Sequence, residues 1–108
     1  MRFDDYQKAA LGTAIYAGRH RVIYPALGLA SEAGEVAGKI KKVLRDLDGD
    51  FDRAPLEAIK DELGDVLWYV AVLAADLGLS LEEIAADNVA KLAARRQRGT
   101  IGGAGDHR

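Results

Sequence analysis

The sequence predicts an all-α protein on three grounds. Apolar residues recur every three or four positions over most of its 108 residues, as they do along one face of a helix. Gly, Pro and acidic residues fall where such helices would begin or end. No stretch alternates apolar and polar residues in the manner of a half-buried strand. We therefore expect four helices in a single domain over residues 1–98, followed by a Gly-rich C-terminal tail over residues 99–108.

The first predicted helix begins at Asp4 or Asp5, because either side chain can cap exposed backbone N–H groups. Its helical spacing of apolar and small residues runs from Tyr6 to Ala17. Small residues would let another helix approach closely, so we interpret this helix as structural. A basic connector follows over Gly18–Tyr24, and its charges are either simply solvated or steer an anionic substrate.

The second predicted helix runs from about Pro25 to Arg45, and proline suits a first helical turn. The acidic segment 46–53 has Asp spacings like those of a calcium-binding loop, but the closing Glu of that loop is absent, which favours a plain connection between helices. The third predicted helix begins near Pro55 and ends before Gly78, a residue typical of helix C-termini.

The fourth predicted helix opens with Ser80 and Glu83, which have the spacing of a capping box. Its apolar stripe contains Asn88 near the centre. A buried amide must find hydrogen-bond partners or destabilise the fold, so Asn88 either sets the register of an interface or contacts a substrate. Lys91 and Arg95 follow it at i+3 and i+7 on the same side, which favours the substrate interpretation.

Two acidic pairs, thirty positions apart, mark the second and third helices: Glu32 with Glu35, and Glu62 with Asp65. Each pair flanks an apolar stripe, so antiparallel packing of the stripes would gather all four carboxylates. One such pair alone is usually only a solvated face. Four unneutralised carboxylates about 5 Å apart would repel by roughly 3 kcal/mol per pair at an effective dielectric near 20. Oxygen ligands, with no Cys or His between them, favour a hard cation such as Mg²⁺ or Mn²⁺.

Composition excludes several classes of protein. A net charge of −2 and a pI near 5.6 argue against a nucleic-acid-binding surface, which needs a basic face. The absence of Cys excludes disulfides and thiolate metal sites. No apolar run approaches the length of a membrane span and no signal-peptide pattern opens the chain, so we expect no membrane partner and a cytoplasmic location.

The segments Gly28–Lys42 and Asp61–Tyr69 contain the two acidic pairs as ExxE and ExxD motifs. With these motifs the chain resembles the MazG-like family of all-α nucleoside triphosphate pyrophosphohydrolases. That family often begins its first motif with two adjacent Glu, whereas here Ser31 precedes Glu32. The resemblance covers nearly the whole chain, from Tyr6 to a GxGDxR-like end formed by Gly103, Gly105, Asp106 and Arg108.

The resemblance implies a four-helix bundle completed by oligomerisation, as a homodimer or homotetramer with the site at or near the subunit contact. It also implies hydrolysis of a nucleoside triphosphate between the α and β phosphates, with release of pyrophosphate, as in housecleaning of the nucleotide pool. Mg²⁺, or Mn²⁺ in its place, would bind Glu32, Glu35, Glu62 and Asp65. Glu32 or Glu35 would also orient or deprotonate the attacking water.

The remaining polar residues suggest substrate contacts. Tyr69 and Asn88 would contact the base or ribose, whereas the cations Lys39, Lys91 and Arg95 would contact the phosphates. Lys39 also has the spacing of an ordinary ion pair with Glu35.

The tail, with Arg108, is either plainly disordered or closes over the bound triphosphate as a lid.

Three alternatives differ in function. Related all-α pyrophosphohydrolases act on phosphoribosyl-ATP or on dUTP, and nothing in the sequence identifies the base. A non-catalytic helical dimerisation module would explain the apolar stripes, but not the paired carboxylates. A di-iron carboxylate bundle is disfavoured because it needs Glu-x-x-His motifs. The positions where His would be needed hold Glu35 and Asp65.

Overall fold

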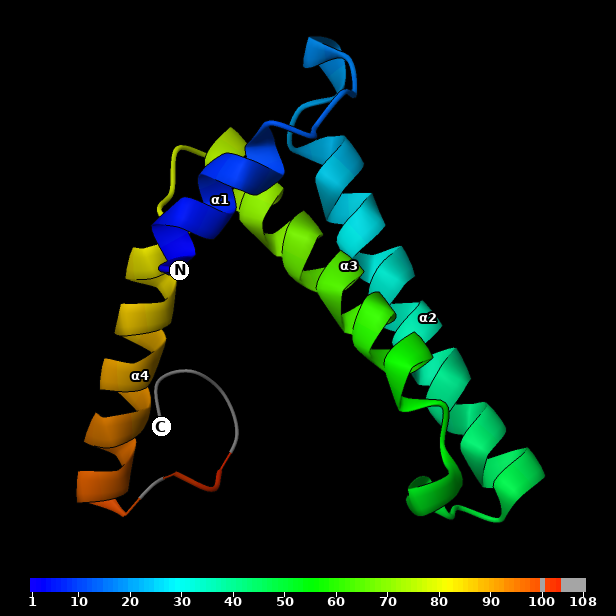
Figure 1. The fold of residues 1–108 in the computed structure, drawn as a ribbon. Helices are drawn as coiled ribbons and strands as arrows, with labels where there is room; N and C mark the ends of the chain where they lie inside the picture. The colour runs from blue at the N-terminus through cyan, green and yellow to red at the C-terminus, as the bar shows by residue number, and fades with distance from the viewer. Residues whose placement is uncertain (100, 104–108) are drawn as a thin grey trace.

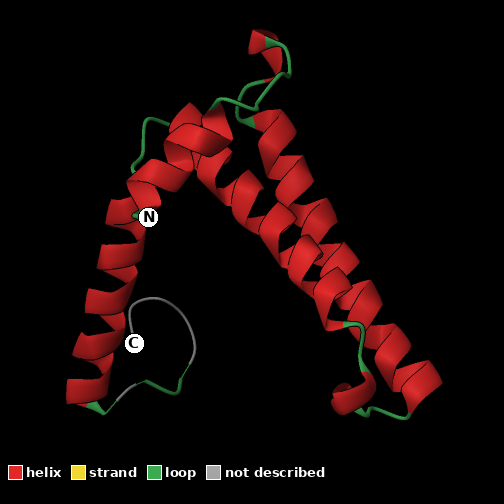
Figure 2. Ribbon diagram, in the orientation of Figure 1, coloured by secondary structure: helices red, strands yellow, loops and turns green. Residues whose placement is uncertain are grey.

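The computed structural model describes residues 1–99 and 101–103, and over these residues it contains helices and no strand. The predicted all-α class is confirmed. Helices α2 and α3 form a long antiparallel hairpin, α1 lies across one end of it, and α4 leads away from that end (Figures 1 and 2). In chain order the elements are α1 Phe3–Leu11, η1 Gly18–His20, α2 Ile23–Leu47, η2 Phe51–Arg53, α3 Leu56–Asp76 and α4 Leu81–Arg98.

Helix α1 ends at Leu11, so the prediction that it continues to Ala17 is wrong. The hydroxyl of Thr13 donates to the Ala10 carbonyl over 2.7 Å and accepts the indole N–H of Trp68 over 2.8 Å. Thr13 thus lies outside the helix and contacts α3 instead. The local spacing of apolar residues does not predict this contact.

The other helix ends lie close to their predicted positions. Helix α2 extends two residues beyond the prediction at each end, and Pro25 is buried in its first turn, where a missing N–H costs nothing. It ends at Leu47, and the two residues that follow it, Asp48 and Gly49, both have positive φ, at 55° and 74°. Helix α3 ends at Asp76, and Gly78 has a φ of 73°, which glycine adopts without strain.

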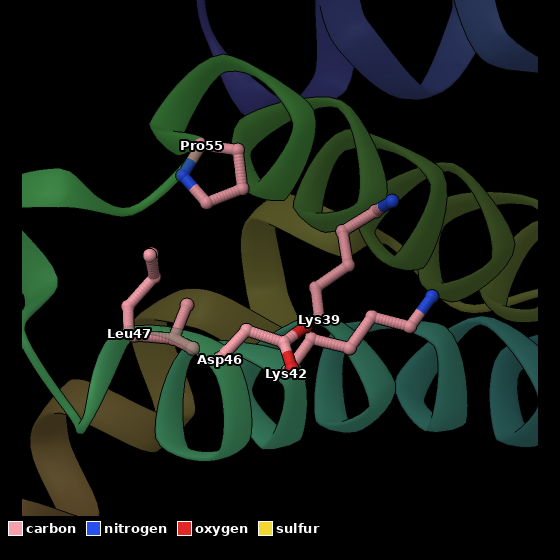
Figure 3. A pocket seen from close by; sticks show the side chains of 6 residues that line it. Lys39, Lys42, Asp46, Leu47 and Pro55 are labelled. Atoms are coloured by element: carbon pink, nitrogen blue, oxygen red, sulfur yellow. The ribbon is translucent and has the colours of Figure 1, made fainter.

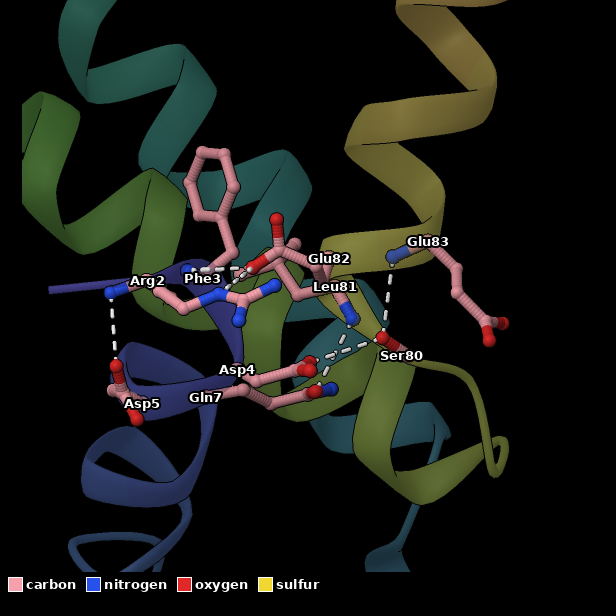
Figure 4. A network of polar contacts seen from close by, with 9 residues as sticks. All are labelled: Arg2, Phe3, Asp4, Asp5, Gln7, Ser80, Leu81, Glu82 and Glu83. Carbon is pink, nitrogen blue, oxygen red and sulfur yellow. Dashed lines mark hydrogen bonds and ion pairs between the residues drawn. The ribbon is translucent and has the colours of Figure 1, made fainter.

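The start of α4 is tied to the start of α1 by side-chain hydrogen bonds (Figure 4). The Ser80 hydroxyl accepts the Glu83 backbone N–H over 3.1 Å, which confirms the predicted N-cap, and donates to Asp4 Oδ1 over 3.0 Å. Phe3 N–H donates to Glu82 Oε1 over 3.1 Å. These contacts fix where α4 begins relative to α1.

Gln7 completes this junction from the middle of α1. Its side-chain amide donates to the carbonyls of Ala71 and Leu79 over 3.1 and 3.0 Å, and its carbonyl accepts the Leu81 N–H over 3.1 Å. One side chain therefore connects α1 with the end of α3, the following turn and the start of α4.

The best-packed core lies at this same junction, where Ala10, Ala71, Val72 and Leu81 are buried together. Away from it, large apolar side chains remain exposed, with exposed fractions of 68% at Leu27, 70% at Leu44, 53% at Leu63 and 67% at Val89. The radius of gyration is 16.7 Å, against about 13 Å for a compact chain of this length. The single chain is thus an open arrangement of helices, and completion of the bundle by oligomerisation stays a prediction.

Among the described residues, no single helix is long and apolar enough to cross a membrane. Helices α3 and α4 meet the length and composition criteria only when they are taken together, and they are bent by 106° relative to each other.

Candidate active site

The α2–α3 hairpin gathers three of the four predicted carboxylates. One oxygen each from Glu32 on α2 and from Glu62 and Asp65 on α3 lies within 4.8 Å of the others, and we call this set the carboxylate cluster. Ligand oxygens around Mg²⁺ are about 3.0–4.2 Å apart, given Mg–O distances near 2.1 Å. Small side-chain rotations would therefore bring these oxygens to a single ion, and an all-oxygen donor set suits a hard cation.

The electrostatics of the cluster show unbalanced negative charge. The pKa of the Glu32 carboxyl is raised above its ordinary value. The main cause is a hydrogen bond shared with Glu62, followed by burial and by repulsion from the neighbouring carboxylates. Lys39 Nζ lies 3.8 Å from Glu62 Oε1, where it supplies part of the missing positive charge. The Glu62 side chain is only 20% exposed, so water screens this contact less than it would on an open surface.

Glu35, the fourth predicted ligand, is exposed and lies outside the carboxylate cluster. Its charge still contributes to the raised pKa of Glu32, but less than Glu62, burial and Asp65 do. Its predicted roles as a metal ligand and as the residue that orients water stay predictions.

Tyr69 lies on α3 near the carboxylates of the cluster, and its ring packs against α2 at Gly28. A Cβ atom added at Gly28 would come within 2.1 Å of Tyr69 Cε1, so only glycine leaves room for this ring. Burial, followed by a hydrogen bond shared with Tyr24 and the charges of Tyr24, Glu32 and Asp65, raises the pKa of the Tyr69 hydroxyl. The predicted substrate contact Tyr69 therefore stands between the carboxylates and a group of further aromatic rings.

Those rings come from three segments of the chain. The Tyr16 and Tyr24 rings are stacked with centroids 5.0 Å apart, the Tyr24 and Tyr69 centroids are 6.4 Å apart, and the Trp68 ring meets Tyr69 edge-on at 5.0 Å. They border a cavity of about 300 Å³, which we call the aromatic pocket. Its lining residues are Thr13, Ile15, Tyr16, Ala17, His20, Tyr24 and Trp68.

Tyr16 and Tyr24 are not among the site residues predicted from the sequence. One signal was available for Tyr24, because Tyr24, Gly28 and Glu32 recur every four positions and must share one side of α2. No local signal exists for Tyr16, since it lies in a connector and reaches the pocket only through the fold.

A second cavity, of about 280 Å³, lies toward the closed end of the hairpin and is lined by Lys39, Lys42, Val43, Asp46, Leu47 and Pro55. The side chains of Lys39 and Lys42 extend in the same direction, away from Leu47 and Pro55 (Figure 3). On a helix, side chains lean toward the N-terminus, so both ammonium groups reach back toward the carboxylate cluster.

The predicted contacts on α4 are not brought to the cluster within this chain. Helix α4 packs mainly on α1 and the end of α3 and then diverges from the hairpin (Figure 1). Asn88 is exposed, whereas Lys91 is half-buried and Arg95 is buried. Arg108, with most of the predicted lid, lies outside the described residues. These substrate roles stay predictions.

Comparisons with known proteins agree with the acidic motifs. The family model described as "MazG nucleotide pyrophosphohydrolase domain" matches residues 25–100, which include α3, α4 and all but the first two residues of α2. The chain is also 45% identical over 114 aligned positions to the "Gene 37 protein" of Mycobacterium phage L5, with all of both chains covered. The name of that relative states no activity. No solved structure gives a significant match.

Proposed function

Since the chain belongs to the MazG nucleotide pyrophosphohydrolase family, we propose that it hydrolyses a nucleoside triphosphate to the monophosphate and pyrophosphate in a Mg²⁺-dependent reaction. The observation that supports this most strongly is the carboxylate cluster, in which Glu32, Glu62 and Asp65 offer oxygens within 4.8 Å of one another. Three carboxylates alone would repel a triphosphate, so a divalent cation between them is what makes the site usable.

When bound, Mg²⁺ supplies positive charge that neutralises the phosphate oxygens and favours attack on phosphorus. Glu32, Glu62 and Asp65 would hold the ion. Glu35 is exposed next to this set, and as a carboxylate it would orient the attacking water and accept its proton. Lys39, and beside it Lys42, would bind phosphate oxygens, Lys39 after release from its ion pair with Glu62.

The aromatic pocket supports the position of the base. It adjoins the cluster through Tyr69, and a planar heteroaromatic ring stacks well on tyrosine and tryptophan rings. On this arrangement the base lies toward Tyr16 and Tyr24, and the phosphates lie toward Glu32 and Lys39. The ribose would lie near Tyr69.

A homo-oligomer, either a dimer or a tetramer, is part of the proposal. Large apolar side chains are left exposed along α2, α3 and α4, and contact with further copies of the chain would cover them. The radius of gyration of 16.7 Å also reflects an open single chain, so other helices could pack beside the hairpin.

The test is the release of pyrophosphate from a panel of nucleotides, with and without Mg²⁺. The panel contains the standard ribonucleoside and deoxynucleoside triphosphates, triphosphates with oxidised bases, dUTP and phosphoribosyl-ATP. Pyrophosphate with monophosphate as products, from at least one nucleotide and only with a divalent cation, is the expected result. Release of single phosphates would contradict cleavage between the α and β phosphates, and no turnover of any nucleotide would favour a dimerisation module.

A matched pair of variants separates the site from the rest of the surface. Glu62→Gln keeps the shape of a cluster residue and removes its charge, so it should abolish pyrophosphate release. Asp87→Asn makes the same kind of change at an exposed position on α4 and should leave the rate unchanged.

A further inference from the structure

Asp76, the last residue of α3, carries a carboxylate that is almost fully enclosed, with a side-chain exposure of 6%. Its Oδ2 atom accepts the Tyr16 hydroxyl over 2.7 Å and the backbone N–H of Val22 over 2.9 Å. Its Oδ1 atom lies 3.5 Å from Arg21 Nε. All three partners belong to the connector between α1 and α2, so this one carboxylate holds that connector against the end of α3.

The connector contains a backbone conformation that is unfavourable by itself. Val22 has φ 67° and ψ −57°, and Ile23 N–H donates to the Arg21 carbonyl over 2.7 Å. These values describe a tight γ-turn of the rare, strained form, and a β-branched residue makes positive φ still less favourable. Such a turn persists only where surrounding contacts hold it, and the Val22 N–H bond to Asp76 is one of those contacts.

The strained turn lies between two walls of the aromatic pocket. Tyr16 precedes it and Tyr24 comes two residues after Val22, and their rings are stacked with centroids 5.0 Å apart. Asp76 binds the Tyr16 hydroxyl directly and sets the direction in which α2 begins, and therefore where Tyr24 points. The relative placement of the two rings thus depends on a residue that does not itself line the pocket.

We propose that Asp76 is a positioning residue for the aromatic pocket: it holds the strained turn at Val22 and the Tyr16 hydroxyl, and so keeps Tyr16 and Tyr24 in place for a planar base. The occupant of the pocket rests on the proposed function, but the hold of Asp76 on the turn does not. Asp76 touches neither the carboxylate cluster nor the aromatic cavity, so it acts on base binding and not on the chemical step.

The charges around Asp76 agree with this role. Burial by itself would raise the pKa of the Asp76 carboxyl, but hydrogen bonds from Val22, Tyr16 and Arg21 outweigh it and hold the pKa below its ordinary value. Burial, then the bond to Asp76, raises the pKa of Tyr16 to about 12, so its hydroxyl keeps its proton and remains a donor. The contact is therefore intact throughout the neutral pH range.

The first measurement needs no nucleotide. Hydrogen exchange of the backbone amide at position 22 should be at least tenfold faster in Asp76→Asn than in the wild-type protein, whereas Asp87→Asn should leave it unchanged. Because Asn can leave the fold less stable, Tyr16→Phe serves as a milder second variant that removes one hydroxyl and keeps the ring. Unchanged exchange at position 22 in Asp76→Asn would overturn the proposal.

The second measurement follows nucleotide binding through the fluorescence of Trp68, the one tryptophan of the chain, which lines the pocket. For a non-hydrolysable triphosphate, we expect Asp76→Asn to raise the dissociation constant at least tenfold and Tyr16→Phe about threefold. In turnover the same variants should raise KM and leave kcat within twofold. A fall in kcat with unchanged KM would overturn the positioning role.

A rescue variant distinguishes a held turn from general stabilisation. Glycine adopts positive φ without strain, so in Val22→Gly the turn should depend less on its hydrogen bond to Asp76. In the double variant, Val22→Gly with Asp76→Asn, the affinity should recover at least threefold over Asp76→Asn alone. No recovery would overturn the link through the strained turn. If even the wild-type protein binds no nucleotide, the proposed function fails, while amide exchange still decides whether Asp76 holds the turn.

Discussion

The carboxylates at the two ends of helix α3 differ in how their charge is satisfied. Near its C-terminus, Asp76 is enclosed and receives donors from Tyr16, Arg21 and Val22, which hold its pKa below the ordinary value. In its first half, Glu62 and Asp65 meet Glu32, whose pKa is raised. At that cluster the structure shows one ion pair within the described residues, from Lys39.

The difference separates a structural carboxylate from one available to a ligand. A carboxylate with enough N–H and O–H donors is complete within the fold, and removing it leaves those donors unsatisfied. A cluster with more acids than donors is electrostatically incomplete, and a cation improves it. The predictions that follow test this contrast from the largest expected effect to the smallest.

Removal of the two kinds of carboxylate should change stability in opposite directions. Asp76→Ala leaves the Tyr16 hydroxyl and the Val22 N–H without their acceptor, so we expect the free energy of unfolding to fall by about 2–4 kcal/mol. Glu62→Ala relieves repulsion in the cluster and should leave the free energy of unfolding unchanged or higher in metal-free buffer. Urea unfolding measures both, and similar losses for the two variants would break the contrast.

Loss of charge at the cluster should abolish turnover without unfolding the protein. For Asp65→Asn we expect pyrophosphate release to fall more than tenfold, since loss of a metal ligand usually costs about 10- to 100-fold. The melting temperature should stay the same or rise, because one repelling charge is gone. More than about a tenth of the wild-type rate would count against Asp65 as a ligand, with Asp87→Asn as the matched control.

Mg²⁺ should raise the thermal stability of the wild-type protein. At a concentration tenfold above its dissociation constant, an ion that binds only the folded state adds about 1.4 kcal/mol. For a domain of this size that corresponds to a rise in melting temperature of roughly 6–11 °C. The rise should vanish in Glu62→Gln and persist in Asp76→Asn. An equal rise in all three proteins would place the ion elsewhere.

The pH dependence of stability should carry the smallest signal, with two parts of opposite sign. Glu32 has a raised pKa when folded, so in metal-free protein stability should increase slightly as pH falls from 7 toward the ordinary Glu value, about 4.3. Asp76 has a lowered pKa, so its contribution is present above about pH 4 and is lost as pH falls further.

Thermal melts between pH 3 and 8 in the presence of a chelator would show both parts. In Glu32→Gln the increase between pH 7 and 5 should be absent, whereas the loss below pH 4 should remain. A steady decrease from pH 7 downward in the wild-type protein would contradict the assignment to Glu32.

The amino-acid sequence by itself determined the all-α class and most helix ends. Pro25, Gly78 and the Ser80 cap act within one turn of their own position, so local rules locate them. The meeting of Glu32 with Glu62 and Asp65 also followed from the sequence, because helical spacing puts each acidic group beside an apolar stripe and an antiparallel hairpin needs only those stripes to pack. Glu35, which the same spacing predicts beside them, is exposed and lies outside the cluster.

Only the tertiary structure decided the connector, the aromatic pocket and the direction of α4. Just beyond the early end of α1, Thr13 accepts the indole N–H of Trp68, and the strained turn at Val22 donates its N–H to Asp76; each partner is more than fifty residues away in the chain. Likewise Asn88 is exposed because the junction around Gln7 directs α4 away from the hairpin. Periodicity reports which face of a helix is apolar, but contacts between distant segments choose what that face meets, and no local pattern encodes that choice.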